Sequence, residues 1–264
     1  MKVAARPQTP KCAPRDLDTG RALDQPEQEP AAPLRSPTNR DPWTVGGALA
    51  RSGSEPPLKL AWPLAALAVA LVALYWRQTL LVDQDAFIGQ FGFTPAELLE
   101  GGWYQPVTAL FVHGSWGHVL INTAFALAFG TPVVRRLGSS VLGAGLFLLF
   151  FLVCGVVGNA GYGLAHANGL GPVVGASGAI AGFLGGASRL IGQRRGVAAL
   201  TSPNVVLMAA VIISTNVIVG IFHITGGPGS DGAPVAWETH IAGYLAGLLL
   251  IGLFDAAANG PRRS

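Results

Sequence analysis

Six stretches of this 264-residue chain are apolar over enough length to approach the thickness of a lipid bilayer. A bilayer's hydrocarbon core requires about 20 mostly apolar residues per helix. Half of all residues are apolar and 12% are charged, a balance that a water-soluble domain of this size rarely has. We therefore predict an all-α, polytopic membrane protein with six transmembrane helices, at residues 61–82, 118–134, 141–160, 176–192, 204–222 and 239–256.

The N-terminal region differs sharply in composition. Residues 1–57 are rich in Pro, Arg, Asp and Gln and lack sustained hydrophobic periodicity, so they cannot bury enough apolar surface to offset their ordering entropy. This region has no apolar stretch followed by a small-residue cleavage site, so we do not interpret it as a secretory signal. We predict a disordered tail over 1–57, a membrane domain over 58–257 and a short C-terminal tail over 258–264.

The positions of the basic residues indicate how the chain is oriented, because cytoplasmic loops retain Lys and Arg. The loops 83–117, 161–175 and 223–238 contain no Lys or Arg. The other connections and the ends carry Arg135, Arg136, Arg189, Arg194, Arg195, Lys59, Arg262 and Arg263. Both termini are therefore expected in the cytoplasm. The low charge and heavy Ala and Gly usage suit a bacterial inner membrane.

Net charge and cysteine content exclude several other classes. The formal net charge of +3 comes with a tail of mixed sign, which argues against nucleic-acid binding. Cys12 lies in the tail and Cys154 in an apolar stretch, so we expect no disulfide. We also expect no metal site and no cofactor.

The first outer loop contains a helix-start pattern in the sequence TPAELLEGG. Thr94 suits the N-cap, Pro95 the first helical position and Glu97 the third position after the cap, with glycine as the stop. We predict a short amphipathic helix here, lying at the outer interface.

In this predicted topology, four polar side chains lie at a similar depth in the outer leaflet of the membrane. Three predicted helices enter from the outside, with Ser177, His240 and the pair His118 and Asn122 near their starts. Polar groups at such depth are costly and mostly mark function. Ser177 alone would suit a hydroxyl bonded to a neighbouring backbone; the set of four favours a reactive site.

Glycines accompany both Ser177 and His240 at helical spacing. Gly178, Gly182 and Gly186 follow the serine, and Gly243 and Gly247 follow the histidine. Small residues four apart permit close backbone approach between membrane helices. The glycines would therefore bring the hydroxyl within reach of the imidazole.

These side chains suit acyl transfer. Ser177 would be the nucleophile, activated by proton transfer to His240. Backbone amides at the helix start, with Asn122 and His118, would stabilise the oxyanion. Because no acid lies at matching depth, we expect a Ser-His dyad.

At these residues the sequence resembles the rhomboid family of intramembrane serine proteases. The motifs are HGSWGHVLIN, GASGAIAG and HIAGYLAG, in that order, within residues 60–257. The resemblance implies a compact six-helix bundle, a Ser177 and His240 dyad, and an oxyanion hole formed by His118, Asn122 and the Ser177 amide. It also implies membrane-spanning protein substrates cut near the outer surface, and no cofactor.

Three positions depart from the family's usual pattern. Tyr104 follows Trp103 where an arginine is common, Val134 stands where a glutamate often precedes an arginine, and Ala181 occupies the place of an aromatic residue that supports the histidine ring. These changes affect supporting residues and leave the reacting groups in place.

Other interpretations stay open at the sequence level. A non-catalytic rhomboid-like protein that binds transmembrane clients is the main alternative, and a small transporter is a weaker one. A soluble-hydrolase elbow is rejected because Ala179 breaks its G-x-S-x-G pattern. His113 is interpreted as forming a structural hydrogen bond inside the outer loop, and His166 and His223 as solvated. The loop 223–238 is interpreted as a connector that could act as a lid.

Overall fold

The computed structural model describes residues 60–81, 83–169, 171–223 and 234–260, and these ranges are all-helical without a β-strand. The predicted tail 1–57 and most of the 223–238 loop lie outside the described residues. The helices are α1 (Trp62–Thr79), α2 (Gln84–Phe91), η2 (Pro95–Glu97), α3 (Gln105–Thr108), η3 (Ala109–Phe111), α4 (Trp116–Leu137), α5 (Val141–Ala165), α6 (Ser177–Leu190), α7 (Pro203–Ile221) and α8 (Trp237–Asn259).

Four of these helices, α4, α5, α7 and α8, are long and apolar enough to cross a membrane. Each coincides with a predicted span to within a few residues at either end, apart from five extra residues at the end of α5. The helices α1 and α6 match two further predicted segments, but α6 has only 14 residues. The count of six spans therefore stays a prediction.

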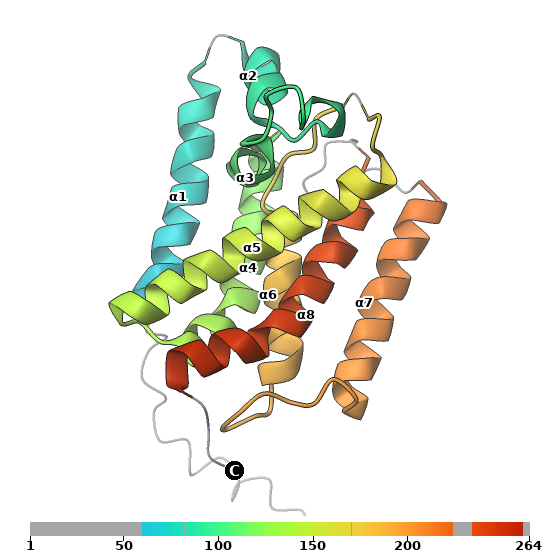
Figure 1. Ribbon diagram of the computed structural model, residues 1–264. Helices are drawn as coiled ribbons and strands as arrows, with labels where there is room; N and C mark the ends of the chain where they lie inside the picture. The colour runs from blue at the N-terminus through green and yellow to red at the C-terminus, as the bar shows by residue number, and fades with distance from the viewer. Residues whose placement is uncertain (1–59, 82, 170, 224–233, 261–264) are drawn as a thin grey trace, which may run out of the picture. The chain divides into compact units, whose positions relative to one another are not determined.

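Helix α6 lies at the centre of the bundle (Figure 1), in contact with α4, α5 and α8. Helix α1 packs on α4, and α7 packs beside α8. The core around α6 is aromatic: Phe183 stacks on Phe147, and Phe150 and Phe151 adjoin it, all of them buried. A helix surrounded by other helices can be short and glycine-rich because it does not face lipid.

The glycine faces of α6 and α8 meet directly, as their spacing predicts. A side chain added at Gly243 would collide with the carbonyl oxygen of Gly178, and one added at Gly247 with the carbonyl oxygen of Gly182. The third predicted glycine, Gly186, faces Phe150 and Ile251 instead. Two glycine pairs therefore set the distance between the helices that carry Ser177 and His240.

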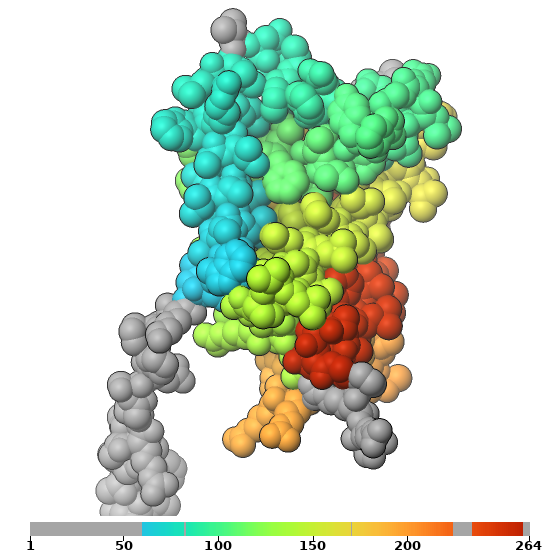
Figure 2. Space-filling model, turned by 60° about the vertical axis from the view of Figure 1, so that its left-hand side comes forward, coloured from blue at the N-terminus to red at the C-terminus, as the bar shows by residue number. Residues whose placement is uncertain are grey.

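The segment 83–115 covers the end of the bundle at which α4, α6 and α8 begin (Figures 1 and 2). It is attached to the segment before α6: Phe93 and Val173 exchange backbone hydrogen bonds, and the Gly175 amide donates to the carbonyl oxygen of Ala109. This connection holds the chain that leads into Ser177.

The helix predicted from Thr94 is only a three-residue 3-10 turn, Pro95–Glu97, and the Thr94 hydroxyl makes no capping bond. The physical reason is Gln105, whose side-chain oxygen accepts from the Thr94 amide at 3.0 Å and whose amide donates to Glu97 at 2.8 Å. The longer helix of this loop is α2, which the Asp83 side chain caps.

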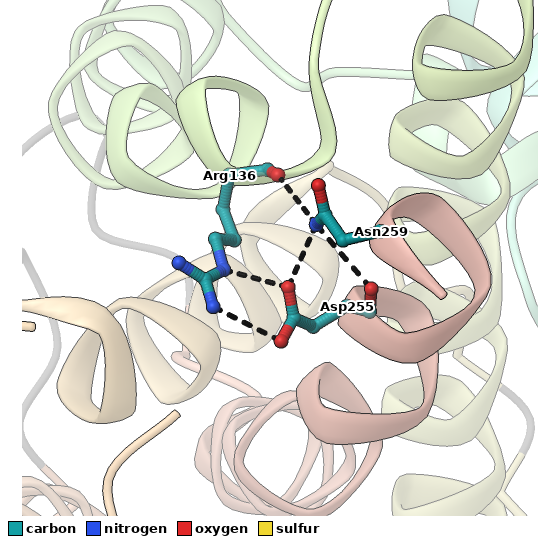
Figure 3. A network of polar contacts seen from close by, with 3 residues as sticks. All are labelled: Arg136, Asp255 and Asn259. Carbon is teal, nitrogen blue, oxygen red and sulfur yellow. Dashed lines mark hydrogen bonds and ion pairs between the residues drawn. The ribbon is translucent and has the colours of Figure 1, made fainter. Parts of the chain in front are cut away.

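The opposite end of the bundle is tied by an ion pair (Figure 3). Arg136 of α4 donates to both carboxylate oxygens of Asp255 on α8, at 2.6 and 3.0 Å, and Asn259 bridges the two. Val134 is buried in the core. The carboxylate that pairs with Arg136 therefore comes from Asp255 of α8, and not from position 134 of α4.

Candidate active site

Ser177 and His240 are in hydrogen-bonding contact. Ser177 is the first residue of α6, His240 lies in the first turn of α8, and the Ser177 Oγ to His240 Nε2 distance is 2.9 Å. Both side chains are half-buried. A hydroxyl at this distance can pass its proton to the imidazole without rearrangement.

Sequence reasoning missed the other partner of the histidine. Asn216 of α7 places its Oδ1 atom 3.0 Å from His240 Nδ1, and its amide nitrogen donates to the Ile212 carbonyl oxygen at 2.9 Å. An amide side chain inside an apolar span is a signal in itself. That signal could have identified Asn216, although the sequence does not fix the rotation of α7.

His118 and Asn122 lie on one face of α4 and adjoin the chain that leads into Ser177. At Gly175, a methyl group would lie 2.6 Å from His118 Nε2 and 3.4 Å from Asn122 Nδ2. Gly175 also has φ +112°, a conformation that favours glycine. A side chain at this position would therefore be strained and would displace the two polar groups.

Asn122 is 3% exposed, and its Nδ2 atom has no hydrogen-bond partner among the described residues. A buried amide donor without an acceptor costs free energy, and its presence calls for an explanation. His118 is half-buried beside it, in the first turn of a helix that Ser115 caps. The site thus contains a buried donor that is unused by the described residues.

His113 packs against His118, but neither of its ring nitrogens has a hydrogen-bond partner among the described residues, so the hydrogen bond expected of this ring is not formed there. Its ring is fully buried and packs edge-on against His118 with ring centroids 5.1 Å apart. Its backbone exchanges hydrogen bonds with the Gln78 side chain, at 2.7 and 3.2 Å. Burial and the adjacent His118 lower the pKa of His113 to about 3, so this ring is neutral at physiological pH.

The remaining outer histidines, His166 and His223, are both exposed. His166, interpreted as a solvated loop residue, ends α5 and contacts Glu238 at 2.8 Å, so it has a partner in the protein. His223 follows the last turn of α7 and is exposed.

Two departures noted in the sequence have visible replacements. Tyr104 donates from its hydroxyl to the Gln90 carbonyl oxygen at 3.3 Å and packs against Phe91, which attaches the loop without an arginine. Ala181 packs against a small cluster of Val205, Tyr244 and Leu248. The His240 ring is instead contacted at Nδ1 by Asn216, from a different helix.

The described residues contain no cluster of three His, Cys, Asp or Glu side chains that could hold a metal ion. What they contain is a hydroxyl against an imidazole, an amide oxygen on the far ring nitrogen, and an unused donor nearby. Such a set can carry out nucleophilic attack with general base assistance.

Comparison with known proteins identifies the family of this chain. A family model described as the rhomboid domain matches residues 100–256, a range that contains Ser177, His240, His118, Asn122 and Asn216. This chain belongs to the rhomboid family. With four apolar helices of sufficient length, this rhomboid is a multi-pass membrane protein.

Two relatives come from Bacillus subtilis (strain 168). The rhomboid protease GluP is 31% identical over 168 residues, which cover 62% of this chain and 29% of GluP. The protein YdcA is 28% identical over 180 residues, which cover 63% of this chain and 85% of YdcA. The rhomboid described here therefore spans less than a third of the length of GluP.

Proposed function

We propose that this chain is an intramembrane serine endopeptidase that hydrolyses peptide bonds in or near the transmembrane segments of other membrane proteins. It crosses a bacterial inner membrane six times, with both termini in the cytoplasm and the site open to the outside. The observation that carries the proposal is the 2.9 Å contact between Ser177 Oγ and His240 Nε2 within a rhomboid domain.

In the first step, Ser177 Oγ attacks the carbonyl carbon of the substrate while its proton passes to His240 Nε2. The tetrahedral intermediate collapses, the C–N bond breaks, and His240 donates that proton to the leaving amine. Water then attacks the acyl-enzyme with His240 again as base, which releases the acid and restores the hydroxyl.

Charge on the intermediate requires donors placed where the oxyanion forms. The Ser177 amide stands in the first turn of α6, where the helix dipole is positive. Asn122 and His118 adjoin the same stretch of chain, and the Asn122 amide is buried without an acceptor among the described residues. The free energy lost by leaving the Asn122 amide unpaired in the resting protein is recovered when the oxyanion accepts a hydrogen bond from it.

The test is labelling by a fluorophosphonate, which bonds Ser Oγ to phosphorus and expels fluoride. Full-length protein in detergent should label, and Ser177→Ala should not. Ser139→Ala, which changes an exposed serine before α5, is the matched control and should label like the wild type. Equal labelling of wild type and Ser177→Ala would defeat the assignment.

Cleavage of a transmembrane substrate separates a protease from a non-catalytic client-binding protein. His240→Ala should lower turnover by about a hundredfold or more, the range of general base catalysis. Retained turnover would dismiss His240 as the base. Binding of the transmembrane segment without cleavage by the wild type would favour the client-binding alternative.

A further inference from the structure

Asn216 lies on the side of His240 opposite to Ser177. It comes from α7, whereas Ser177 comes from α6 and His240 from α8. The three side chains form a continuous chain of contacts, with Ser177 Oγ 2.9 Å from Nε2 and Asn216 Oδ1 3.0 Å from Nδ1. The arrangement therefore includes a third residue beyond the expected dyad.

The orientation of the Asn216 amide decides which ring nitrogen carries the proton. Its Nδ2 atom donates to the Ile212 carbonyl oxygen, one helical turn earlier, at 2.9 Å. The Oδ1 atom therefore faces His240, and a carbonyl oxygen can only accept. The proton of the neutral ring must then lie on Nδ1, which leaves the lone pair of Nε2 directed at the Ser177 hydroxyl.

We propose that Asn216 is the positioning residue of His240: its side-chain oxygen holds the proton on Nδ1 and so keeps Nε2 in the tautomer that accepts from Ser177. This inference rests on the proposed function and adds the group that orients the base. Serine and cysteine proteases use an Asp or Asn acceptor in this place. Here that acceptor stands in for the aromatic support that Ala181 cannot give.

The test compares fluorophosphonate labelling rates across pH for three α7 variants. Asn216→Leu keeps the size and removes the acceptor, and its labelling rate should fall about tenfold to a hundredfold. Thr215→Val, an exposed neighbour on the same helix, is the matched control and should label like the wild type.

Asn216→Asp restores an acceptor and gives a readout that a packing role would not change. A carboxylate beside Nδ1 stabilises the protonated ring, so the acidic limb of the rate profile should move to higher pH. Other titratable groups that act on the ring are His118 of α4 and Glu238 of α8, which all variants share. At high pH this variant should label faster than Asn216→Leu.

Labelling of Asn216→Leu at the wild-type rate would overturn the positioning role, while an unlabelled Ser177→Ala would leave the proposed function standing. Should Asn216→Leu fail to fold, Asn216→Asp decides: an acidic limb at the wild-type pH overturns the inference. Equal labelling of Ser177→Ala and wild type instead sinks the proposed function itself.

A second, independent observation lies at the opposite end of the bundle. A cavity of about 360 Å³ opens between the ends of α4 and α6, lined by Arg135, Arg136 and Arg194 with Thr131, Gln193 and three apolar residues. Asp255 neutralises Arg136. Within the described ranges, Arg135 and Arg194 have no carboxylate partner, so the cavity carries two uncompensated positive charges.

We infer that this cavity binds a phosphate group, supplied by the headgroup of an anionic phospholipid. Two arginines offer the forked donors that suit phosphate oxygens. Thr131 adds a hydroxyl, and the apolar residues Pro132, Leu190 and Ile191 would lie against acyl chains. Basic pockets between membrane helices on the cytoplasmic side bind such headgroups.

Native mass spectrometry of the full-length protein in detergent tests this site with added phosphatidylglycerol or phosphatidylcholine. Wild type should retain one phosphatidylglycerol in preference to phosphatidylcholine. The double variant Arg135→Gln/Arg194→Gln should bind it about tenfold to thirtyfold more weakly, as two surface arginines are worth. Arg195→Gln, an exposed neighbour outside the cavity, should match the wild type.

Equal retention by the double variant and the wild type would overturn the site. Competition by inorganic phosphate distinguishes the two sources of the group: lipid retained in millimolar phosphate supports the phospholipid, whereas loss of the lipid identifies free phosphate as the occupant and overturns the phospholipid assignment.

Discussion

Helices α6 and α7 both pack against α8, yet they differ strongly in burial. Ten of the 14 residues of α6 are buried, against one residue, Val205, in the 19 of α7. Helix α6 touches α8 through paired glycines, backbone to backbone. Helix α7 exposes large apolar side chains such as Leu207, Val211 and Ile218.

The difference in burial between α6 and α7 means that Ser177 and Asn216 are held in position in two different ways. Ser177 begins a helix whose other residues are mostly buried, so the packing of α6 against α4, α5 and α8 positions its backbone. Asn216 is positioned by a mostly exposed helix and by its own bond to Ile212. The proposed nucleophile is therefore positioned mainly by packing, and the acceptor behind the proposed base mainly by hydrogen bonding.

The largest expected effect comes from filling the contact between α6 and α8. Gly247→Val would drive a side chain into the Gly182 carbonyl group, where the backbone cannot yield, and should cost about 3 kcal/mol or more together with nearly all activity. The measurement is thermal inactivation in detergent, with residual fluorophosphonate labelling. Gly145→Val, at a helical glycine with open space around it, is the control. Similar losses for both variants would contradict the packing account.

His240 joins the two regions, since Nε2 faces α6 and Nδ1 faces α7. A base must be neutral to accept a proton, so the labelling rate should rise tenfold for each pH unit while the protonated ring dominates, and then level off. The measurement is the wild-type labelling rate from strongly acidic to neutral pH. A flat profile over that range would remove His240 as the titrating base.

A smaller effect is expected at the ion pair between α4 and α8. Arg136→Met leaves the buried Asp255 carboxylate without its partner and should destabilise the bundle by about 2–4 kcal/mol. Arg136→Met/Asp255→Leu removes both charges and should cost less than the single change. Thermal inactivation measures both, with the exposed Arg195→Met as control. A double variant that is less stable than Arg136→Met would refute this account.

The smallest effect should come from α7, in a matched pair of leucines. Leu190→Ala on α6 removes a side chain that is 7% exposed and should cost about 2–3 kcal/mol, whereas Leu207→Ala on α7, 65% exposed, should change stability by less than about 0.5 kcal/mol. The two variants are compared in one thermal inactivation assay. Equal costs would mean that α7 is held as tightly as α6.

The sequence predicted those features that depend on pattern along the chain. The spans of α4, α5, α7 and α8 follow from apolar length, and the contact between α6 and α8 follows from glycines four apart. His118 and Asn122 share a face because they are one turn apart. Each of these is a property of a single helix or of a helix pair with complementary faces.

The features that sequence reasoning missed depend on neighbours distant in the chain. Asn216 lies 24 residues before His240, and its approach depends on the rotation of α7, which a nearly uniform apolar surface does not reveal. Thr94 carries a valid capping pattern, but Gln105 binds its amide and only a short turn forms. Asp255 pairs with Arg136, although 119 residues separate the two in the chain.

Cys154 lies within α5, fully buried, where its side chain presses on Gly182 inside the aromatic core. A thiol reagent can reach this sulfur only when α5 parts from α6. In protein with Cys12 replaced, the rate of Cys154 alkylation would therefore measure how often the bundle opens. This rate can be measured in native lipid and without any substrate.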